Sequence, residues 1–223
     1  TNYEEYDDYK DDWLDDEEED DDDEGVAAEK KALTPQDIKE IKQEISELRD
    51  IHKLAVSISS NSKGTCLLNA LRLGFEHMDS MDAPRKALIF TESRRTQEYL
   101  YNLLEENGYA GKIILFNGSN NDAKSKEIYN SWLEKYKNTS RITGSKTADK
   151  RQALVEYFKD NAQIMIATEA AAEGINLQFC SLIVNFDLPW NPQRVEQRIG
   201  RCHRYGQKYD VVVVNFINKS NRA

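Results

Sequence analysis

Two short apolar runs constrain the fold of this chain most. Residues 164–168 (IMIAT) form the first, and the second opens the segment 182–192 (LIVNFDLPWNP). Each is long enough for a strand buried on both faces and too short for a buried helix. The second run leads into Asn191 and Pro192, which together make a good helix start. Strands buried on both faces are typical of parallel sheets covered by helices, so the sequence predicts an α/β fold with a parallel sheet.

Polar residues follow both predicted strands. Ligands of open α/β sheets bind beyond the carboxyl ends of the strands. At that edge we expect Thr168 and Gly174 after the first strand, and Asp187 and Trp190 after the second. A cap at the end of the strand would explain Thr168 equally well.

Residues 191–206 predict a short helix that ends near Gly206. At about 100° per residue, one face of this helix is polar and contains Arg194, Gln197, Arg201 and Arg204. The opposite face is apolar and contains Val195, Ile199 and Cys202. Guanidinium groups fixed in a row suit a transferring phosphoryl group, whose charge spreads over three oxygens. A solvated basic helix on a nucleic-acid-binding surface is the alternative.

The same helix carries a family resemblance. Residues 197–207 (QRIGRCHRYGQ) resemble motif VI, QRxxRxxRxGQ, of Swi/Snf-like ATPases in helicase superfamily 2. The matching positions are Gln197, Arg198, Arg201, Arg204, Gly206 and Gln207. In that family the last two arginines reach the γ-phosphate of ATP across a cleft between two RecA-like lobes. The resemblance therefore implies that Arg201 and Arg204 are catalytic arginine fingers and that Gln197 also contacts ATP.

The segment after the first apolar run resembles motif V of the same family. There Thr168 corresponds to the threonine that touches a nucleic-acid phosphate, and Gly174 and Asn176 lie in the turn that approaches the nucleotide. The chain departs from the family at Ala171 and Ala172, where many members have two glycines. Methyl groups restrict the approach of a backbone to a phosphate, so these two positions receive no role.

Two further segments fit the family. Residues 86–93 (KALIFTES) resemble motif IV, in which a strand opens a helix at about Ser93. Ser93 and Arg94 would then bind DNA phosphate at the helix N-terminus, although a plain capping serine explains Ser93 as well. This helix would end near Gly108, and its inward residues would be Tyr99, Leu100, Leu103 and Leu104.

Residues 142–158 resemble the segment that follows the backbone of one DNA strand. The DNA contacts implied there are Thr143, Gly144, Ser145 and Lys146. The stretch 117–141 before it is longer than the family usually needs. Its apolar residues recur at helical spacing, so we expect a short inserted helix in which Trp132 packs.

The resemblance covers residues 62–217, within a predicted RecA-like lobe of 62–223 that opens with a helix at 65–78. Residues 34–61 predict a long amphipathic helix that begins with a capping box at Thr34 and packs against one of the lobes. A coiled-coil dimer is the alternative.

Residues 1–33 predict an acidic leader or a linker between lobes. The first 24 residues contain 16 Asp and Glu and one Lys, whereas the rest of the chain has a net charge of +5. Such acidic blocks usually stay solvated. Tyr3, Tyr6, Trp13 and Leu14 interrupt this one at spacings that would also allow docking on a basic surface.

Neither a GxxxxGK[ST] phosphate loop nor a strand ending in paired acidic residues occurs in the 223 residues. We therefore expect a first RecA-like lobe to hold the phosphates of ATP and the Mg²⁺ ion, and we expect this chain alone to be inactive. No run of about 18 apolar residues suggests a membrane span. Cys66, Cys180 and Cys202 are expected to be reduced core residues of a cytoplasmic protein, and no spacing suggests a metal site.

Together these features predict the second motor lobe of an ATP-dependent double-stranded DNA translocase or remodeller of the Swi/Snf-like type. A strand-separating superfamily 2 DNA or RNA helicase is one alternative, and a non-catalytic nucleic-acid-binding module is another. No aromatic residue occupies the motif positions expected to face nucleic acid, which favours translocation without unwinding.

Overall fold

The computed structural model describes residues 34–57, 61–169 and 174–217, and the predicted leader lies outside them. The chain divides into two units, one with helix α2 (Pro35–Ser57) and one with the α/β domain from Lys63 onward. A capping box starts α2: the Asp37 amide donates to Thr34 Oγ1 at 3.2 Å, and the Thr34 amide donates to Asp37 Oδ2 at 2.8 Å. The apolar side chains from Ile38 to Leu54 are 40 to 68% exposed.

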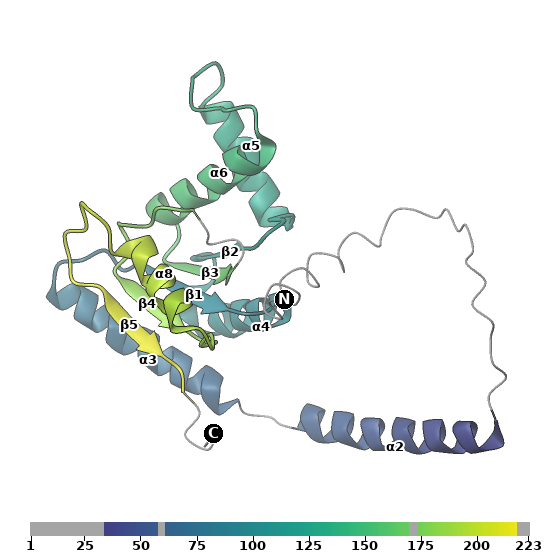
Figure 1. The fold of residues 1–223 in the computed structure, drawn as a ribbon. Coiled ribbons are helices and arrows are strands. Elements are labelled where there is room, and N and C mark those ends of the chain that lie inside the picture. The colour runs from purple at the N-terminus through teal and green to yellow at the C-terminus, as the bar shows by residue number, and fades with distance from the viewer. Residues whose placement is uncertain (1–33, 58–60, 170–173, 218–223) are drawn as a thin grey trace. The chain divides into compact units, whose positions relative to one another are not determined.

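A five-stranded sheet forms the centre of the α/β domain (Figure 1). Its strands lie in the order β2 (Ile113–Phe116), β3 (Ile164–Thr168), β1 (Ala87–Thr91), β4 (Leu182–Asn185) and β5 (Val212–Asn215). All neighbouring strands pair in parallel, which confirms the predicted fold. The central strand β1 pairs with β3 from Ala87–Ile164 to Thr91–Thr168.

Helices cover both faces of this sheet (Figure 1). One face packs against α3 (Ser62–Ser80) and α4 (Arg94–Leu104), which continues into a π-helical turn, η1 (Glu105–Tyr109). The other face packs against α5 (Ala123–Lys135), α6 (Lys146–Asp160) and α8 (Pro192–Cys202). Successive strand residues point to opposite faces of the sheet. Leu88 therefore lies in the core beneath α5, α6 and α8, and Ile89 lies in the core beneath α3 and α4.

The arginine-bearing helix is shorter than the sequence predicts. It starts as expected, with Asn191 as the cap, but it ends at Cys202 instead of near Gly206. The carbonyl of Arg201 accepts the Leu177 amide at 2.9 Å, so a tertiary contact replaces a helical one. Arg204 therefore lies beyond the helix and not on its polar face.

Two other expectations about packing are wrong. Tyr99 is 37% exposed, because the buried stripe of α4 is formed by Gln97, Leu100 and Leu104. Cys66 is exposed on α3, whereas Cys180 and Cys202 are buried with free thiols. The predicted strand pattern also missed β5 at the edge of the sheet.

Candidate functional site

Polar residues collect where β1, β3 and β4 end. Thr91 and Thr168 are register partners at the carboxyl ends of β1 and β3. The Asp187 carboxylate, just after β4, accepts hydrogen bonds from Thr91 Oγ1 at 2.9 Å and from the Glu92 amide at 3.1 Å. Its other oxygen lies 2.7 Å from Lys63 Nζ, in the first turn of α3. Asp187 thus fastens α3 to the edge where ligands of such sheets bind.

The two carboxylates at this edge have opposite pKa shifts. Burial alone would raise the pKa of Asp187, but the hydrogen bonds from Lys63, the Glu92 amide and Thr91 hold that pKa below its usual value. Glu92 has a raised pKa, because it is partly desolvated and lies close to the negative charge of Asp187. Asp187 therefore stays ionised as part of the framework.

Arg198 is the most buried polar side chain of α8, with 2% exposure. Its Nε lies 2.7 Å from Glu169 Oε2, and its Nη1 donates to Asn185 Oδ1 at 3.0 Å and to the Asp187 carbonyl at 2.8 Å. The guanidinium also lies 4.7 Å from the centre of the Phe90 ring. Arg198 therefore holds α8 against the ends of β3 and β4.

The sequence interpretation gave Arg198 no role beyond its match to motif VI. A signal was available in the helical spacing. Arg198 lies three residues after Val195 and four before Cys202, so it falls on the side of the helix that faces the core. An arginine on a buried stripe needs acceptors inside the domain, which Glu169 and Asn185 supply.

Three side chains predicted to bind ATP lie on α8 or just after it, and they are more exposed than Arg198. Arg201 is half-buried, and its guanidinium makes no hydrogen bond or ion pair within the part of the chain that the structure describes. Arg204 is exposed, and its Nε donates to the Gly200 carbonyl at 2.9 Å. Gln197 is also exposed. These donors are therefore largely available to a ligand.

The predicted nucleotide turn lies beside the end of α8. Gly174 has a φ of +77°, a conformation that favours glycine. Asn176 Oδ1 accepts the Gln178 amide at 3.3 Å, which orders the turn. The hydrogen bond between Leu177 and Arg201 then brings this turn next to the arginine helix. The structure thus places Gly174 and Asn176 in the same neighbourhood as Arg201.

The donors predicted to bind phosphate at the start of α6 are partly engaged. The Thr143 amide and hydroxyl donate to Asp149 Oδ1 at 2.9 and 2.7 Å, and the Gly144 amide donates to Asp149 Oδ2 at 3.3 Å. These bonds, the Thr143 amide first, lower the pKa of Asp149. The Ser145 hydroxyl and the Lys146 ammonium group make no such bond among the described residues, and both residues are exposed.

The start of α4 contacts the loop after β2. Ser93 caps the helix by accepting the Thr96 amide at 3.1 Å, as the simpler interpretation predicts. Arg94 Nη2 donates to Ser119 Oγ at 3.2 Å. Lys150 Nζ, from α6, donates to the Ser119 carbonyl at 3.4 Å. The structure therefore gathers Arg94 and α6 around one loop, and Lys150 is a basic residue there that the motifs did not reveal.

The described ranges contain no group of three or more His, Cys, Asp or Glu side chains placed to hold a metal ion. None of the helices in those ranges is both long and apolar enough to cross a bilayer.

Comparisons with known proteins identify relatives of this domain. The family profile described as "Helicase conserved C-terminal domain" matches residues 95–206. The chain is 40% identical over 134 residues to the uncharacterized ATP-dependent helicase YqhH of Bacillus subtilis, covering 60% of this chain and 19% of that protein. It is 43% identical over 76 residues to the RNA polymerase-associated protein RapA of Vibrio cholerae, covering 34% of this chain and 8% of RapA.

A solved structure has the same fold. The C-terminal part of the Fun30 ATPase domain superposes with a TM-score of 0.51 at 20% sequence identity. The match covers 82% of this chain and 50% of that one. The chain therefore belongs to the helicase conserved C-terminal domain family, and the predicted resemblance to the C-terminal RecA-like lobe of Swi/Snf-like superfamily 2 proteins is confirmed.

Proposed function

We propose that this domain is the second motor lobe of an ATP-dependent translocase on double-stranded DNA. One observation carries the proposal: Arg198 fixes α8 from inside the domain, while Arg201 in the following turn has no partner among the described residues. A guanidinium on a helix held in this way is preorganised for charge that develops in a transition state. In the proposal Arg201 and Arg204 contact the γ-phosphate as arginine fingers.

The rest of the nucleotide site follows from the same arrangement. In the proposal Gly174, Asn176 and Gln197 contact ATP from this lobe, since the turn that holds the first two lies beside Arg201. A first RecA-like lobe holds the triphosphate and Mg²⁺, which neutralises charge on the β- and γ-phosphates. The chain spans about a fifth of the length of YqhH, and a relative of that length has room for such a lobe.

The DNA contacts proposed for this lobe bind the phosphate backbone. They are Ser93, Arg94, Thr143, Gly144, Ser145, Lys146 and Thr168. Because Asp149 already engages Thr143 and Gly144, we assign most of the binding at this end of α6 to Ser145 and Lys146. Contacts to phosphate position a protein on DNA without reading the bases, which suits movement along any sequence.

Steady-state ATP hydrolysis by a protein that contains both lobes tests the proposal. Arg201→Ala or Arg204→Ala is expected to lower kcat about 10³-fold, the scale of an arginine finger. The KM for ATP should change much less, because the first lobe makes most ground-state contacts. Lysine should not restore activity, since it lacks the planar fork.

Arg72→Ala is the matched control, because Arg72 is an exposed arginine of α3 whose partner is Glu76 in the next turn. Near-normal kcat in both Arg201→Ala and Arg204→Ala would reject the assignment. We also expect the 223-residue chain alone to hydrolyse no ATP, so DNA-stimulated hydrolysis by this chain would contradict the two-lobe site.

A further inference from the structure

A groove runs along α6; its lining includes Gly174 and Asn176, which are assigned above to ATP, but neither Arg201 nor Arg204. Its other walls are the loop 174–179 and the segment 135–141, which ends the insertion before α6. The groove has a volume of about 1000 Å³. Its basic lining residues are Lys135, Arg141, Arg151 and Lys159, and its neutral polar ones include Gln152 and Gln178.

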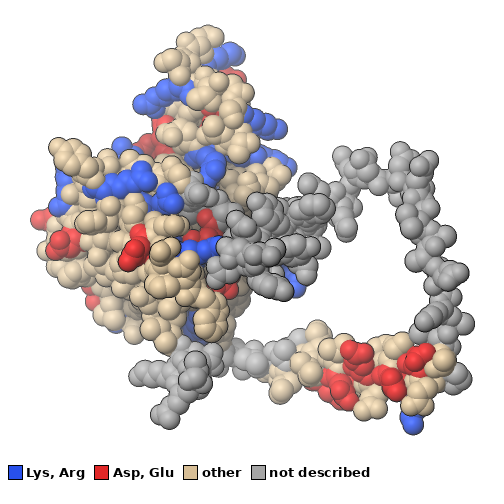
Figure 2. All heavy atoms as spheres, viewed as in Figure 1, with Lys and Arg blue, Asp and Glu red and all other residues tan. Residues whose placement is uncertain are grey.

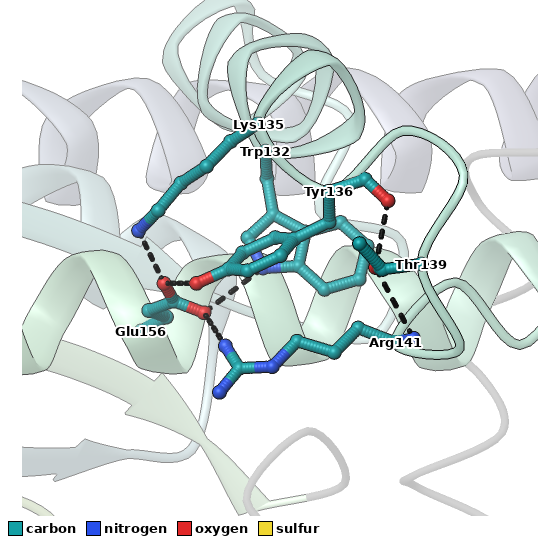
Figure 3. Close-up of polar contacts among 6 residues, drawn as sticks. All are labelled: Trp132, Lys135, Tyr136, Thr139, Arg141 and Glu156. Atoms are coloured by element: carbon teal, nitrogen blue, oxygen red, sulfur yellow. Dashed lines mark hydrogen bonds and ion pairs between the residues drawn. The ribbon is translucent and has the colours of Figure 1, made fainter.

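The groove has an excess of positive charge. Its acidic residues are Glu156 and Asp160. The Glu156 carboxylate is already surrounded by four donors, as Figure 3 shows: Trp132, Lys135, Tyr136 and Arg141. Lys135 Nζ lies 2.6 Å from it and Arg141 Nη1 lies 3.4 Å from it. Two cations thus face one carboxylate, and the lining as a whole has four basic side chains and two acidic ones.

Arg141 is held in place and yet open to solvent. Its guanidinium lies 4.6 Å from the centre of the Tyr136 ring, and its side chain is 59% exposed. The Trp132 ring packs at 5.1 Å against Tyr136 and is itself 4% exposed, so the support is part of the core. A guanidinium has five N–H donors, and the bond to Glu156 uses one of them. The remaining donors can form the forked contact that phosphate prefers.

The groove also continues from the predicted DNA contacts. Ser145 and Thr147 line its beginning at the N-terminus of α6, and Lys159 lines its far end. At about 1.5 Å per helical residue, the distance from Thr147 to Lys159 is about 18 Å. Figure 2 shows Lys and Arg side chains gathered over the end of the domain that carries α5 and α6.

We propose that this groove binds the sugar–phosphate backbone of one nucleic-acid strand, through Arg141, Arg151 and Lys159, beyond the contact at Ser145. In this proposal the inserted segment forms one wall of the groove and positions Arg141 for the strand. Arginine forks and amide side chains match phosphate and sugar oxygens, which favours this ligand over an acidic protein segment. The proposal rests on the proposed function only in that the lobe works on nucleic acid.

Binding of labelled oligonucleotides to the 223-residue chain over a range of salt concentrations tests the groove. Both single-stranded and double-stranded probes are used, because either can present one backbone. Arg151→Gln and Lys159→Gln are each expected to weaken binding several-fold, and the triple variant with Arg141→Gln more than tenfold. Each lost contact should reduce the slope of log K against log salt by about 0.7 for single strands or 0.9 for duplex.

Arg72→Gln on α3 is the control and should change neither affinity nor slope. Lys159 is exposed and has no hydrogen bond or ion pair among the described residues, so Lys159→Gln remains informative even if Arg141→Gln disturbs the insertion. The probe that loses more affinity identifies the strand type that occupies the groove.

Three results would overturn the proposal in distinguishable ways. If the triple variant binds normally while Lys146→Gln binds weakly, the groove is not a strand site and the proposed function stands. If the wild-type chain binds neither probe, both proposals fail. If the groove variants weaken binding only while residues 1–24 are present, the groove acts through the acidic leader and not through nucleic acid.

Discussion

The Arg198 guanidinium lies 2.7 Å from the Glu169 carboxylate, and this pair joins α8 to the end of β3. Arg198 is 2% exposed and the Glu169 side chain 21%, so the pair is largely shielded from water. A shielded charge needs its partner, because an unpaired one in such a place is strongly destabilising. The position of α8, and with it the position of Arg201, thus depends on a residue that faces the core.

Replacing Arg198 should therefore lower the stability of the domain even when no ligand is bound. Arg198→Met keeps an unbranched side chain, although a shorter one, and leaves Glu169 and Asn185 without their donor. We expect the free energy of unfolding to fall by about 3 kcal/mol, the scale for breaking a buried ion pair. Urea denaturation followed by circular dichroism measures the change. Arg72→Met should change it by less than about 0.5 kcal/mol, and equal losses in the two variants would contradict this account.

Glu156 should stabilise the insertion locally. In Glu156→Gln the side chain can still accept the Trp132 Nε1–H, but both ion pairs, with Lys135 and Arg141, are lost. We expect a loss of about 1 to 2 kcal/mol, because hydrogen bonds to charged groups contribute more than neutral ones. Hydrogen exchange should become faster in residues 123–141 and stay unchanged in the central strands.

The matched control for this change is Glu134→Gln, whose carboxylate is 77% exposed and lies 3.9 Å from Lys137. Such exposed pairs contribute little. Exchange rates in residues 123–141 that are the same for both variants would show that Glu156 does not hold the insertion.

Asp187 should make stability depend on acid pH. Its pKa is lower in the folded protein, so its ionised form contributes stability above the ordinary value of about 4, and that contribution is lost as the pH falls through the folded pKa. Asp187→Asn should be less stable at pH 7, and its stability should fall less steeply in acid. Urea midpoints between pH 7 and pH 2 measure this. Asp210→Asn, at an exposed carboxylate, should retain the wild-type slope, and a wild-type slope in Asp187→Asn would be the contrary result.

The acidic leader offers a separate prediction. Residues 1–24 carry a net charge of −15, while the rest of the chain is basic. If the leader competes with DNA for basic surface, its removal should tighten DNA binding and steepen the dependence on salt. Fluorescence anisotropy at low salt measures both. Unchanged affinity would mean that the leader is a passive linker.

The fold was more predictable than the site, because strands buried on both faces appear in the sequence as short continuous apolar runs. The runs 164–167 and 182–184 are continuous and apolar, and they lie in β3 and β4, the two neighbours of the central strand β1. The end of α8 was not predictable locally, because the Arg201 carbonyl is taken by the amide of Leu177, 24 positions earlier. The four consecutive valines at 211–214 carry the same kind of signal, but our interpretation assigned no strand to them, and β5 was missed.

The arginines of motif VI look alike in the sequence, but their surroundings in the fold differ. Arg198 can be buried because Glu169, just after β3, and Asn185, at the end of β4, accept its hydrogen bonds. The Arg201 guanidinium has no acceptor among the described residues. Thr143 and Gly144 matched a phosphate-binding segment, but Asp149 takes their donors. Such competition for donors depends on the folded positions of residues and not on their spacing.

Displacement of a third strand from a DNA triplex tests the central claim most directly. The measurement uses a protein with both lobes, and a forked duplex of equal length is the companion substrate. We predict that ATP hydrolysis displaces the third strand, that Arg201→Lys abolishes this displacement, and that the fork stays closed under the same conditions. Efficient opening of the fork, or normal displacement by Arg201→Lys, would contradict a duplex translocase that depends on this arginine.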